Sequence, residues 1–428
     1  MFTKKTIRDI DVRGKRVLLR ADYNVPINPD GTISDDYRIE QSLPTLRALL
    51  EQDVKLIICS HMGRPEGKPD KTLTLEPVAK RLSELLGRDV AFVPDCVGEV
   101  VQKAVDALQP GQVLLLENVR FHPEEEANDD GFAARLAAWG EVFVQDGFGV
   151  VHRAHASTEG VTHHLPSVAG LLLEREVDTI TKVMEEPERP LMAIIGGAKI
   201  SDKIDVLHRL IDIADFVAVG GAMGNTFLAA EGAFIAKSKY DADDLDVAKE
   251  ILEKAREKAK DQHFIFYVPV DGVVAKTADK NVTTRIVDWK THVISEIESY
   301  PKRPEYATRT IEDDEMILDI GPFSGAFIAG GVQLAKTVIW NGSMGVTEVP
   351  ALSGPVGPFS HGTELIVEAM LGDFGHKPFS LVGGGDTVGY IEQRKLAGLF
   401  NHVSTGGGAS LELMAGRKLP GVEALENR

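Results

Sequence analysis

Basic residues and glycines recur at one kind of position in this chain: directly after short apolar runs. In the first half, arginines and histidines follow these runs, as where Lys55–Cys59 leads into His61 and Arg64. In the second half glycines follow them, as where Phe379–Val382 leads into a triple glycine. Ligands of open α/β sheets bind beyond the carboxyl ends of the strands. The pattern therefore predicts two ligand surfaces, one basic and one glycine-rich, and both would suit anionic substrates.

The basic set contains eight residues that could converge on a small anion. They are Arg20, Arg38, His61, Arg64, Arg120, His152, Arg153 and His155. A guanidinium presents a rigid fork of donors that matches carboxylate and phosphate oxygens. The alternative for any single arginine is a surface ion pair, and Arg20 fits that alternative best because it still belongs to a strand. The His152–His155 cluster could also suggest zinc, but it lacks a nearby cysteine, and we do not favour a metal there.

Two polar residues, Asp22 and Asn24, lie at the end of the first apolar run. They could hydrogen-bond a substrate hydroxyl. The alternative is a turn, since Asp and Asn often bond to nearby backbone at strand ends. Taken alone, these two residues favour the turn.

In the second half, a glycine turn, Gly196-Gly197, precedes Lys199 and Lys203. If this turn opens a helix, its backbone N–H groups and the helix dipole favour an anion. The spacing predicts that the two lysines lie four residues apart on one helix face. Asp202 and Asp205 could instead neutralise them. Neither a Walker A loop nor a G-x-G-x-x-G fingerprint occurs in the chain, so nucleotide binding needs other support.

A second glycine turn, Gly383-Gly384-Gly385, is followed by Asp386 and Thr387. Glycines allow the backbone to approach a phosphate closely, and the Asp386 carboxylate is a candidate ligand for Mg²⁺. Glu348, which follows the stretch Asn341–Gly345, is a candidate for contact with a ribose hydroxyl.

The elements that must position these residues alternate between strands and helices. Twelve apolar runs are expected as strands: 17–19, 55–59, 90–93, 113–116, 142–144, 192–195, 216–219, 264–268, 316–320, 337–340, 379–382 and 402–403. Most are continuous rather than alternating, which is typical of parallel strands covered on both faces. Helices are expected at 42–50, 76–86 and 244–260. A (β/α)₈ barrel is less favoured, because the strands exceed eight and the motifs divide between two halves.

A helix over Val168–Glu186, ending before Pro187, is expected to connect two domains. The predicted fold is therefore α/β, with two doubly wound parallel-sheet (Rossmann-like) domains joined by this helix. The chain of 428 residues is long enough for two cores.

Composition limits the partners. Hydrophobic residues make up 43% and charged residues 26%, as in soluble globular proteins. A formal net charge of −18 argues against nucleic acid and anionic membranes as partners. There are two cysteines, no signal-like start and no long apolar run, which together favour a reducing cytoplasm.

These residues, in this order, resemble the phosphoglycerate kinase family nearly end to end. The most specific stretches of the first half are RADYNVP at 20–26, DDYRIEQSLPTL at 35–46, SHMGRP at 60–65, ENVRF at 117–121 and DGFGVVHRAHAST at 146–158. Those of the second half are GGAKISDK at 196–203, WNGSMG at 340–345, GGGDT at 383–387 and STGGGAS at 404–410.

The resemblance implies reversible phosphoryl transfer from 1,3-bisphosphoglycerate to ADP, which gives 3-phosphoglycerate and ATP, in line and on domain closure about a hinge. It implies Arg38, Lys199 and Lys203 as catalytic residues, with Arg38 at the acyl phosphate. The residues implied for phosphoglycerate are Asp22, Asn24, Arg38, His61, Arg64, Arg120 and Arg153. Those implied for the nucleotide are Gly197, Lys199, Lys203, Gly221, Asn341, Glu348, Gly383, Gly384, Gly385, Asp386 and Thr387, with Asp386 on Mg²⁺.

The family's last helix returns to the first domain. The resemblance thus implies a phosphoglycerate domain of residues 1–170 plus 409–428, a connecting helix of 171–186 and a nucleotide domain of 187–408. A monomeric glycolytic and gluconeogenic enzyme of the cytoplasm is expected, with small-molecule substrates and neither nucleic acid nor membrane as partner.

The chain departs from the family pattern at a few positions. Ser343 stands where Pro is usual, and Gly147 where Ala is usual. The segment Val349–His361 is longer than expected for the family, which weakens the case for Glu348 as a ribose contact. The stretch Lys290–Thr310 also looks extended. Two other functions compete with this one. A nucleotide-dependent dehydrogenase is disfavoured by the missing G-x-G-x-x-G, and a non-catalytic sensor is disfavoured by the intact Arg38, Lys199, Lys203 and Asp386.

Overall fold

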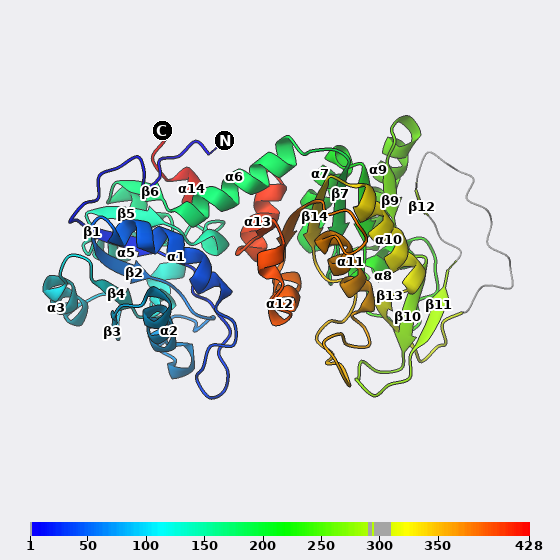
Figure 1. Cartoon of the computed structure of the whole chain (residues 1–428), viewed down its shortest axis with the longest axis horizontal. Helices are drawn as coiled ribbons and strands as arrows, with labels where there is room; N and C mark the ends of the chain where they lie inside the picture. Colours follow the sequence, from blue (N-terminus) through cyan, green and yellow to red (C-terminus); the bar gives the residue numbers. More distant parts are fainter. Residues whose placement is uncertain (1, 290–292, 295–309) are drawn as a thin grey trace. The chain divides into compact units, whose positions relative to one another are not determined.

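The computed structural model describes residues 2–289, 293–294 and 310–428 (Figure 1). The chain divides into two compact units. Unit 1 contains Met1–Thr181 and Thr405–Arg428, and unit 2 contains Lys182–Ser404. The first boundary falls inside helix α6 (Leu171–Glu185). The extended segment expected at Lys290–Thr310 lies almost entirely outside the described residues.

Unit 1 is built on a six-stranded parallel sheet in the order β3-β4-β2-β1-β5-β6. Its strands are β1 (Arg16–Arg20), β2 (Lys55–Cys59), β3 (Val90–Val93), β4 (Val113–Leu116), β5 (Val142–Gln145) and β6 (Ser167–Ala169). Its α-helices are α1 (Tyr37–Leu50), α2 (Glu76–Leu86), α3 (Glu99–Ala107), α4 (Pro123–Glu126), α5 (Asp130–Ala137), α13 (Gly407–Met414) and α14 (Pro420–Glu423).

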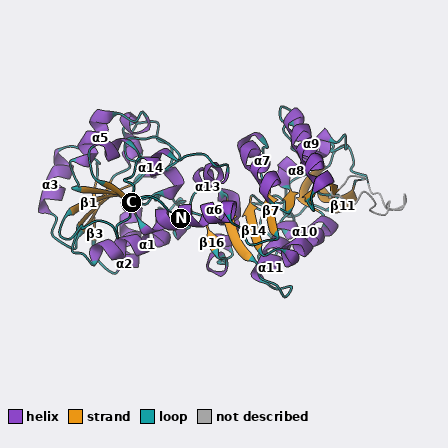
Figure 2. Cartoon of the chain, turned by 90° about the horizontal axis from the view of Figure 1, so that it is seen from above, coloured by secondary structure: helices purple, strands orange, loops and turns teal. Residues whose placement is uncertain are grey.

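Both faces of this sheet are covered, because successive side chains of a strand point to opposite faces. Leu19 and Ile58 pack with apolar residues of α1 and α2 in one core cluster. Leu18 and Ile57, one residue earlier on the same strands, pack with α3 and α5 in a second cluster. Figure 2 shows helices around the strands of this unit. This double burial explains the continuous apolar runs of the sequence.

The end of the chain returns to unit 1, as the fold prediction required. The Lys5 backbone N–H donates to Glu426 O at 2.7 Å, and that of Arg428 donates to Thr3 O at 3.0 Å. Lys4 is buried and donates from Nζ to the carbonyls of Glu423 and Leu425. The two termini are therefore joined through backbone and side chain.

Unit 2 contains a seven-stranded sheet in the order β12-β9-β8-β7-β14-β15-β16. Its strands are β7 (Leu191–Ile195), β8 (Phe216–Val219), β9 (Ile265–Tyr267), β12 (Val293–Ile294), β14 (Thr337–Asn341), β15 (Phe379–Gly383) and β16 (His402–Val403). All pairs are parallel except β12 with β9. Its α-helices are α7 (Ile204–Ile213), α8 (Gly221–Ala230), α9 (Leu245–Asp261), α10 (Pro322–Leu334), α11 (His361–Leu371) and α12 (Gly385–Gln393). In Figure 2, α7, α8 and α9 lie on one face of this sheet, and α10 and α11 lie on the other.

One local expectation was only partly right, and another was wrong. The run Met316–Ile320 forms strand β13 as expected, but this strand belongs to a separate antiparallel sheet with β10 (Asp271–Ala275) and β11 (Arg285–Asp288). Residues 168–169 belong to β6 rather than to the connecting helix, because they pair with β5. The helix α6 starts at Leu171, after Gly170 has donated its N–H to Gln145 O at 2.8 Å.

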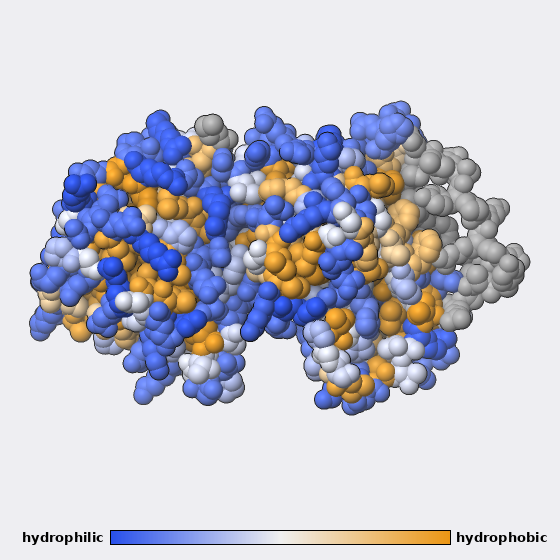
Figure 3. Space-filling model, in the orientation of Figure 1, coloured by the Kyte–Doolittle hydropathy of each residue, from blue (hydrophilic) through white to orange (hydrophobic). Residues whose placement is uncertain are grey.

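The surface drawn in Figure 3 mixes hydrophilic and hydrophobic residues over short distances. Large exposed hydrophobic side chains, such as Leu334 and Leu352, come from several separate elements. Among the described residues, no helix is both long enough and apolar enough to span a membrane.

Candidate active site

The basic residues of unit 1 follow the carboxyl ends of its parallel strands. Arg20 ends β1, His61 comes two residues after β2, and Arg120 lies in a 3₁₀ turn (η2, Val119–Phe121) just beyond β4. Arg153 follows β5 after a second short turn. Because the carboxyl ends of parallel strands share one edge of the sheet, these side chains are brought to one region.

Arg38 is held at the start of α1 by the segment that follows β1. Its Nη1 donates to the backbone O of Asn24 at 2.8 Å and lies 3.5 Å from Asp22 Oδ1. Asn24 also donates its backbone N–H to Asp22 Oδ1 at 3.2 Å, so the turn expected for these residues is formed. The Arg38 side chain remains 30% exposed, which leaves part of its guanidinium available for a ligand.

The loop around Gly63 connects the basic residues. The Gly63 N–H donates to Asn24 Oδ1 at 2.8 Å, and the Gly63 carbonyl accepts from Arg120 Nη1 at 2.8 Å. Arg64, the next residue, is exposed. The structure thus brings Asp22, Asn24, Arg38 and Arg120 into one bonded network, whereas Arg64 joins it only as a chain neighbour of Gly63.

Positive charge dominates the electrostatics of this region. Burial lowers the pKa of His61, and the charges of Arg20, Arg120 and Arg38 lower it further. Burial and the same kind of arginine neighbours lower the pKa of His155 to about 4. The pKa of His152 is also lowered, first by burial and then by the charge of Arg153. These imidazoles are therefore neutral at pH 7, and the arginines provide the charge.

Two ring nitrogens in this cluster lack hydrogen-bond partners. His152 Nδ1 and His155 Nδ1 are buried and unbonded within the described part of the chain. The nearest carboxylate oxygen to His155 Nδ1, on Glu125, lies 3.9 Å away, which is too long for a hydrogen bond. Buried polar atoms are normally satisfied, so an anionic ligand suits this cluster.

Arg20 does not form the surface ion pair that its position suggested. It is fully buried; its Nε donates to Ser157 Oγ at 2.7 Å, and its Nη2 lies 3.3 Å from His61 Nδ1. Ser157 in turn donates to the buried Glu125 at 2.6 Å. Sequence reasoning missed this internal support, because neither Ser157 nor Glu125 follows a strand end.

The candidate nucleotide site of unit 2 is a set of closely packed backbone loops after β7, β8, β14 and β15. A Cβ placed on Gly196 would lie 2.1 Å from Ser343 O, and one on Gly342, whose φ is +101°, would lie 2.3 Å from Gly196 O. Gly221 and Gly197 also adopt positive φ, and the Gly197 carbonyl accepts from Met223 N at 2.9 Å. Only glycine allows backbones to approach this closely.

The two lysines do not share a helix face, which corrects the expectation drawn from their spacing. The segment before α7 is irregular and ends in a 3₁₀ turn over Ser201–Lys203, so the α-helix begins only at Ile204. Lys203 Nζ donates to Gly196 O at 2.6 Å and to Asn341 Oδ1 at 2.8 Å. Lys199 instead lies 3.7 Å from Asp241 Oδ2.

Burial lowers the pKa of Lys203 to about 8, and the charges of Asp386 and Asp202 oppose this change. Lys203 is thus a poorly solvated cation close to the carboxylate predicted to bind Mg²⁺. Beside it, Asn341 Nδ2 is buried without a hydrogen-bond partner within the described residues.

The turn after β15 presents Asp386 to solvent. Gly383 ends β15, Gly384 adopts φ +89°, and Gly385 starts α12, with Asp386 exposed in its first turn. Thr387 is buried, and its Oγ1 accepts from Gly342 N at 2.7 Å. An exposed carboxylate next to glycine turns fits Mg²⁺ carried by substrate phosphates, since Mg²⁺ takes oxygen ligands and keeps several waters. Glu348 is exposed in the loop after β14, and the described residues show no bond from it to this network.

Comparisons with known proteins identify the family. The phosphoglycerate kinase family model matches residues 7–417. The chain belongs to the phosphoglycerate kinase family. It is 45% identical over 427 residues to the phosphoglycerate kinase of Moorella thermoacetica, covering 100% of both chains. It is 44% identical over 429 residues to that of Pelotomaculum thermopropionicum, covering 99% of both.

Solved structures lead to the same family. Phosphoglycerate kinase from Coxiella burnetii superposes with a TM-score of 0.78 at 35% identity, covering 98% of each chain. The enzyme from Pyrococcus horikoshii gives a TM-score of 0.81 at 28% identity, covering 99% of this chain and 98% of that one. The predictions of this family, of the two-domain α/β fold and of a kinase are confirmed. The reaction is the glycolytic one, reversible phosphoryl transfer between 1,3-bisphosphoglycerate and ADP.

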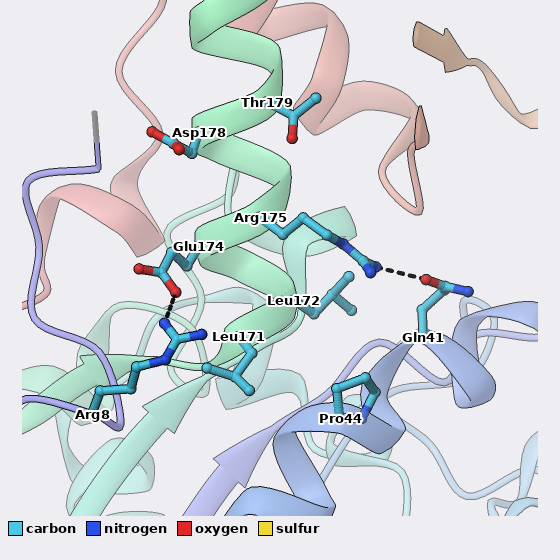
Figure 4. A pocket seen from close by; sticks show the side chains of 9 residues that line it. All are labelled: Arg8, Gln41, Pro44, Leu171, Leu172, Glu174, Arg175, Asp178 and Thr179. Atoms are coloured by element: carbon cyan, nitrogen blue, oxygen red, sulfur yellow. Dashed lines mark hydrogen bonds and ion pairs between the residues drawn. The ribbon is translucent and has the colours of Figure 1, made fainter. Parts of the chain in front are cut away.

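A separate pocket of about 390 Å³ lies in unit 1, between α1, α6 and the segment near the N-terminus (Figure 4). Leu171, Leu172 and Pro44 line it together with charged side chains. The close-up shows Arg175 joined to Gln41 of α1. None of the residues predicted for either substrate lines this pocket.

Proposed function

We propose that the basic cluster of unit 1 holds phosphoglycerate and that the glycine loops of unit 2 hold the Mg²⁺-nucleotide. The observation that carries the first assignment is the set of buried, unbonded nitrogens among crowded arginines. Removing a buried polar atom from water without a partner is costly. A ligand with phosphate and carboxylate oxygens would give these nitrogens and guanidinium groups their acceptors.

The phosphoglycerate residues in this proposal are Asp22, Asn24, Arg38, His61, Arg64, Arg120 and Arg153. Arg38 neutralises charge on the phosphoryl group that moves, because its guanidinium is only partly bonded within the protein. Asp22 and the Asn24 carbonyl orient Arg38. Arg120 fixes the Gly63 loop, which places Arg64 next to the ligand.

In unit 2 the proposed nucleotide residues are Gly197, Lys199, Lys203, Gly221, Asn341, Gly383, Gly384, Gly385, Asp386 and Thr387, with Glu348 near the ribose. Bound Mg²⁺ would neutralise phosphate charge and orient the phosphates. Asp386 would hold it through a carboxylate oxygen. Lys203, a cation with little hydration, would be placed against the nucleotide phosphates, and Asn341 Nδ2 would donate to an oxygen.

The chemistry explains why a cationic set suffices. Phosphoryl transfer depends on positioning and charge neutralisation more than on a general base. The carboxylate that leaves the acyl phosphate needs no proton. We also propose that the two domains close about the connecting helix, because the two reacting groups must meet in line and water must be kept out.

Two broader features complete the proposal. The enzyme works as a monomer, as the resemblance to its family implies. It works in the cytoplasm, where its two cysteines, Cys59 and Cys96, stay reduced; both are free and buried.

Substitution of Arg38 tests the phosphoglycerate assignment. Arg38→Ala should lower kcat by about 10²–10³-fold, the cost of removing one preorganised transition-state donor. Arg81→Ala is the matched control, because Arg81 pairs with Asp36 and Glu84 on the surface. Near-normal kcat in Arg38→Ala, with 3-phosphoglycerate binding intact, would remove Arg38 from the mechanism.

Asp386 tests the second assignment. In calorimetry, Asp386→Ala should weaken Mg-ADP binding while 3-phosphoglycerate binding stays unchanged. Equal loss of both ligands would indicate a structural role for the turn instead.

A further inference from the structure

Three different metal-ligating side chains meet in unit 1 outside the residues assigned to substrates. Asp95 and Cys96 follow β3, and His122 follows the 3₁₀ turn after β4. Each side chain offers one donor atom: a carboxylate oxygen, a sulfur and a ring nitrogen. These three atoms lie within 4.8 Å of one another. Asp95 Oδ1 is 2.9 Å from His122 Nε2.

Hydrogen bonds and ring packing hold the Asp95 carboxylate, the Cys96 backbone and the His122 ring in place. Asp95 Oδ1 accepts the Cys96 N–H at 2.7 Å, and Trp139 Nε1 donates to Cys96 O at 2.9 Å. The His122 ring packs against Phe132, with ring centroids 5.2 Å apart. A site whose ligands are already fixed loses little conformational entropy when it binds a metal.

We propose that Asp95, Cys96 and His122 form a binding site for zinc. Sulfur, imidazole nitrogen and carboxylate oxygen are the donors that Zn²⁺ takes in proteins, and three protein ligands leave a fourth position for water. Mg²⁺ is excluded by its preference for oxygen donors. On binding, the Cys96 S–H bond breaks, the proton passes to solvent, and the thiolate coordinates the metal.

Exposure gives the metal a path to the site. The Cys96 side chain is buried, but the side chains of Asp95 and His122 are 39% and 27% exposed. The metal would enter from the side of the carboxylate and the imidazole, and the open position would face solvent. His122 comes two residues after Arg120, so the site shares a turn with the proposed phosphoglycerate residues while using none of them.

The test uses Co²⁺ as a spectroscopic probe on the full-length, reduced protein. Cobalt bound to this site should give a thiolate-to-metal charge-transfer band in the near ultraviolet and tetrahedral d–d bands in the visible. Added Zn²⁺ should displace it stoichiometrically. Cys96→Ser should abolish the charge-transfer band. His122→Ala should weaken cobalt binding by at least about tenfold, because even the loss of a residue that only hydrogen-bonds a metal ligand lowers metal affinity by about that factor.

Two variants serve as matched controls. Cys59→Ser removes the other buried thiol, and His164→Ala removes an exposed histidine that pairs with Asp130 at 2.8 Å without a neighbouring cysteine. Both should keep the cobalt spectrum. Far-ultraviolet circular dichroism of every variant checks that it is folded.

Absence of a charge-transfer band in the wild-type protein would overturn the proposal and leave an Asp–His pair beside a core thiol. So would a band that survives in folded Cys96→Ser or disappears in Cys59→Ser. Cobalt bound with no sulfur signature would place the metal elsewhere, for example at the histidines of the basic cluster, and would equally overturn it.

Discussion

At the scale of single residues, the low pKa of His155 makes stability depend on pH. In the folded protein this pKa is about 4, whereas an unfolded histidine titrates near 6.5. Below pH 6.5 the unfolded chain therefore binds a proton that the folded chain does not. His155 thus costs no stability above pH 6.5, and destabilises the fold progressively as pH falls towards 4.

We expect His155→Gln to reduce this dependence. Between pH 7 and pH 5, the free energy of unfolding should fall less in the variant than in the wild type, by about 1 kcal/mol after allowance for solvent screening. Urea unfolding at both pH values measures the difference. His164→Ala, at an exposed ring, is the control, and identical pH dependence in His155→Gln and wild type would contradict the assignment.

Lys203 should behave as a residue with both a structural and a functional role. Its Nζ has acceptors in the Gly196 carbonyl and the Asn341 side chain. Lys203→Met would leave these buried acceptors unbonded, which costs about 1–3 kcal/mol. We expect reduced thermal stability together with a strong loss of kcat, measured on one preparation. Lys199→Met is the control. It loses only a 3.7 Å ion pair at an exposed side chain, so it should be as stable as wild type. If Lys199→Met were destabilised as much as Lys203→Met, the structural role assigned to Lys203 would be contradicted.

At the scale of elements, Asp146 anchors the start of α6. It is fully buried, and its Oδ1 accepts from Leu172 N at 3.0 Å and Leu173 N at 3.2 Å. Thr45 Oγ1 of α1 accepts from Leu171 N at 3.0 Å. These bonds satisfy the first N–H groups of the helix, which have no partner within it.

Burial raises the pKa of Asp146 to about 7, well above the unfolded value near 3.9. As pH rises from 4 to 7, the unfolded chain ionises first, so the folded state loses stability over this window. Asp146→Asn keeps an acceptor and cannot ionise. Its free energy of unfolding, relative to wild type, should therefore rise by about 2 kcal/mol between pH 5 and pH 7.

Denaturant unfolding at the two pH values checks this expectation. Asp146→Ala is the matched comparison: it removes the acceptor and should cost about 1 kcal/mol at pH 5, as loss of a helix cap does. If the free energies of unfolding of Asp146→Asn and wild type differ by the same amount at pH 5 and pH 7, the carboxyl group is already ionised in the folded protein and the expectation is contradicted.

The elements that sequence patterns predicted well are those whose local signal and tertiary environment agree. Lys55–Cys59 is buried on both faces and forms β2 over those residues. The run Met316–Ile320 is equally apolar, yet it pairs antiparallel outside the main sheet, because strand partners are set by long-range packing that a single run does not encode. Spacing misplaced Lys199 and Lys203 for a similar reason. The loop glycines allow an irregular, tightly packed segment there, so helical periodicity does not apply.

Side-chain partnerships were the part of the candidate site that patterns could not supply. The sequence places Arg20 in the basic set and favours a surface ion pair for it, whereas in the interior Ser157, 137 residues away, bonds to it. Asp95, Cys96 and His122 carried no spacing motif, because β3 and the turn after β4 become neighbours only when their strands pair. Motifs reveal residues that share a segment, whereas such clusters depend on sheet order.

At the scale of the whole molecule, the two proposed substrate sites belong to different compact units, and phosphoryl transfer requires the reacting atoms to approach within contact distance. A ligand can shift a conformational equilibrium only by its differential affinity for the two states. In the proposed assignment each substrate alone contacts one unit, so neither should favour a closed state as strongly as the pair does. We therefore expect 3-phosphoglycerate together with Mg-ADP, a combination that cannot react, to reduce the radius of gyration in small-angle scattering more than either ligand does alone. Asp386→Ala, measured at the same concentrations, should lose most of this extra compaction while keeping the response to 3-phosphoglycerate. An unchanged radius with both ligands bound, as verified by calorimetry, would contradict closure as the step that assembles the catalytic site.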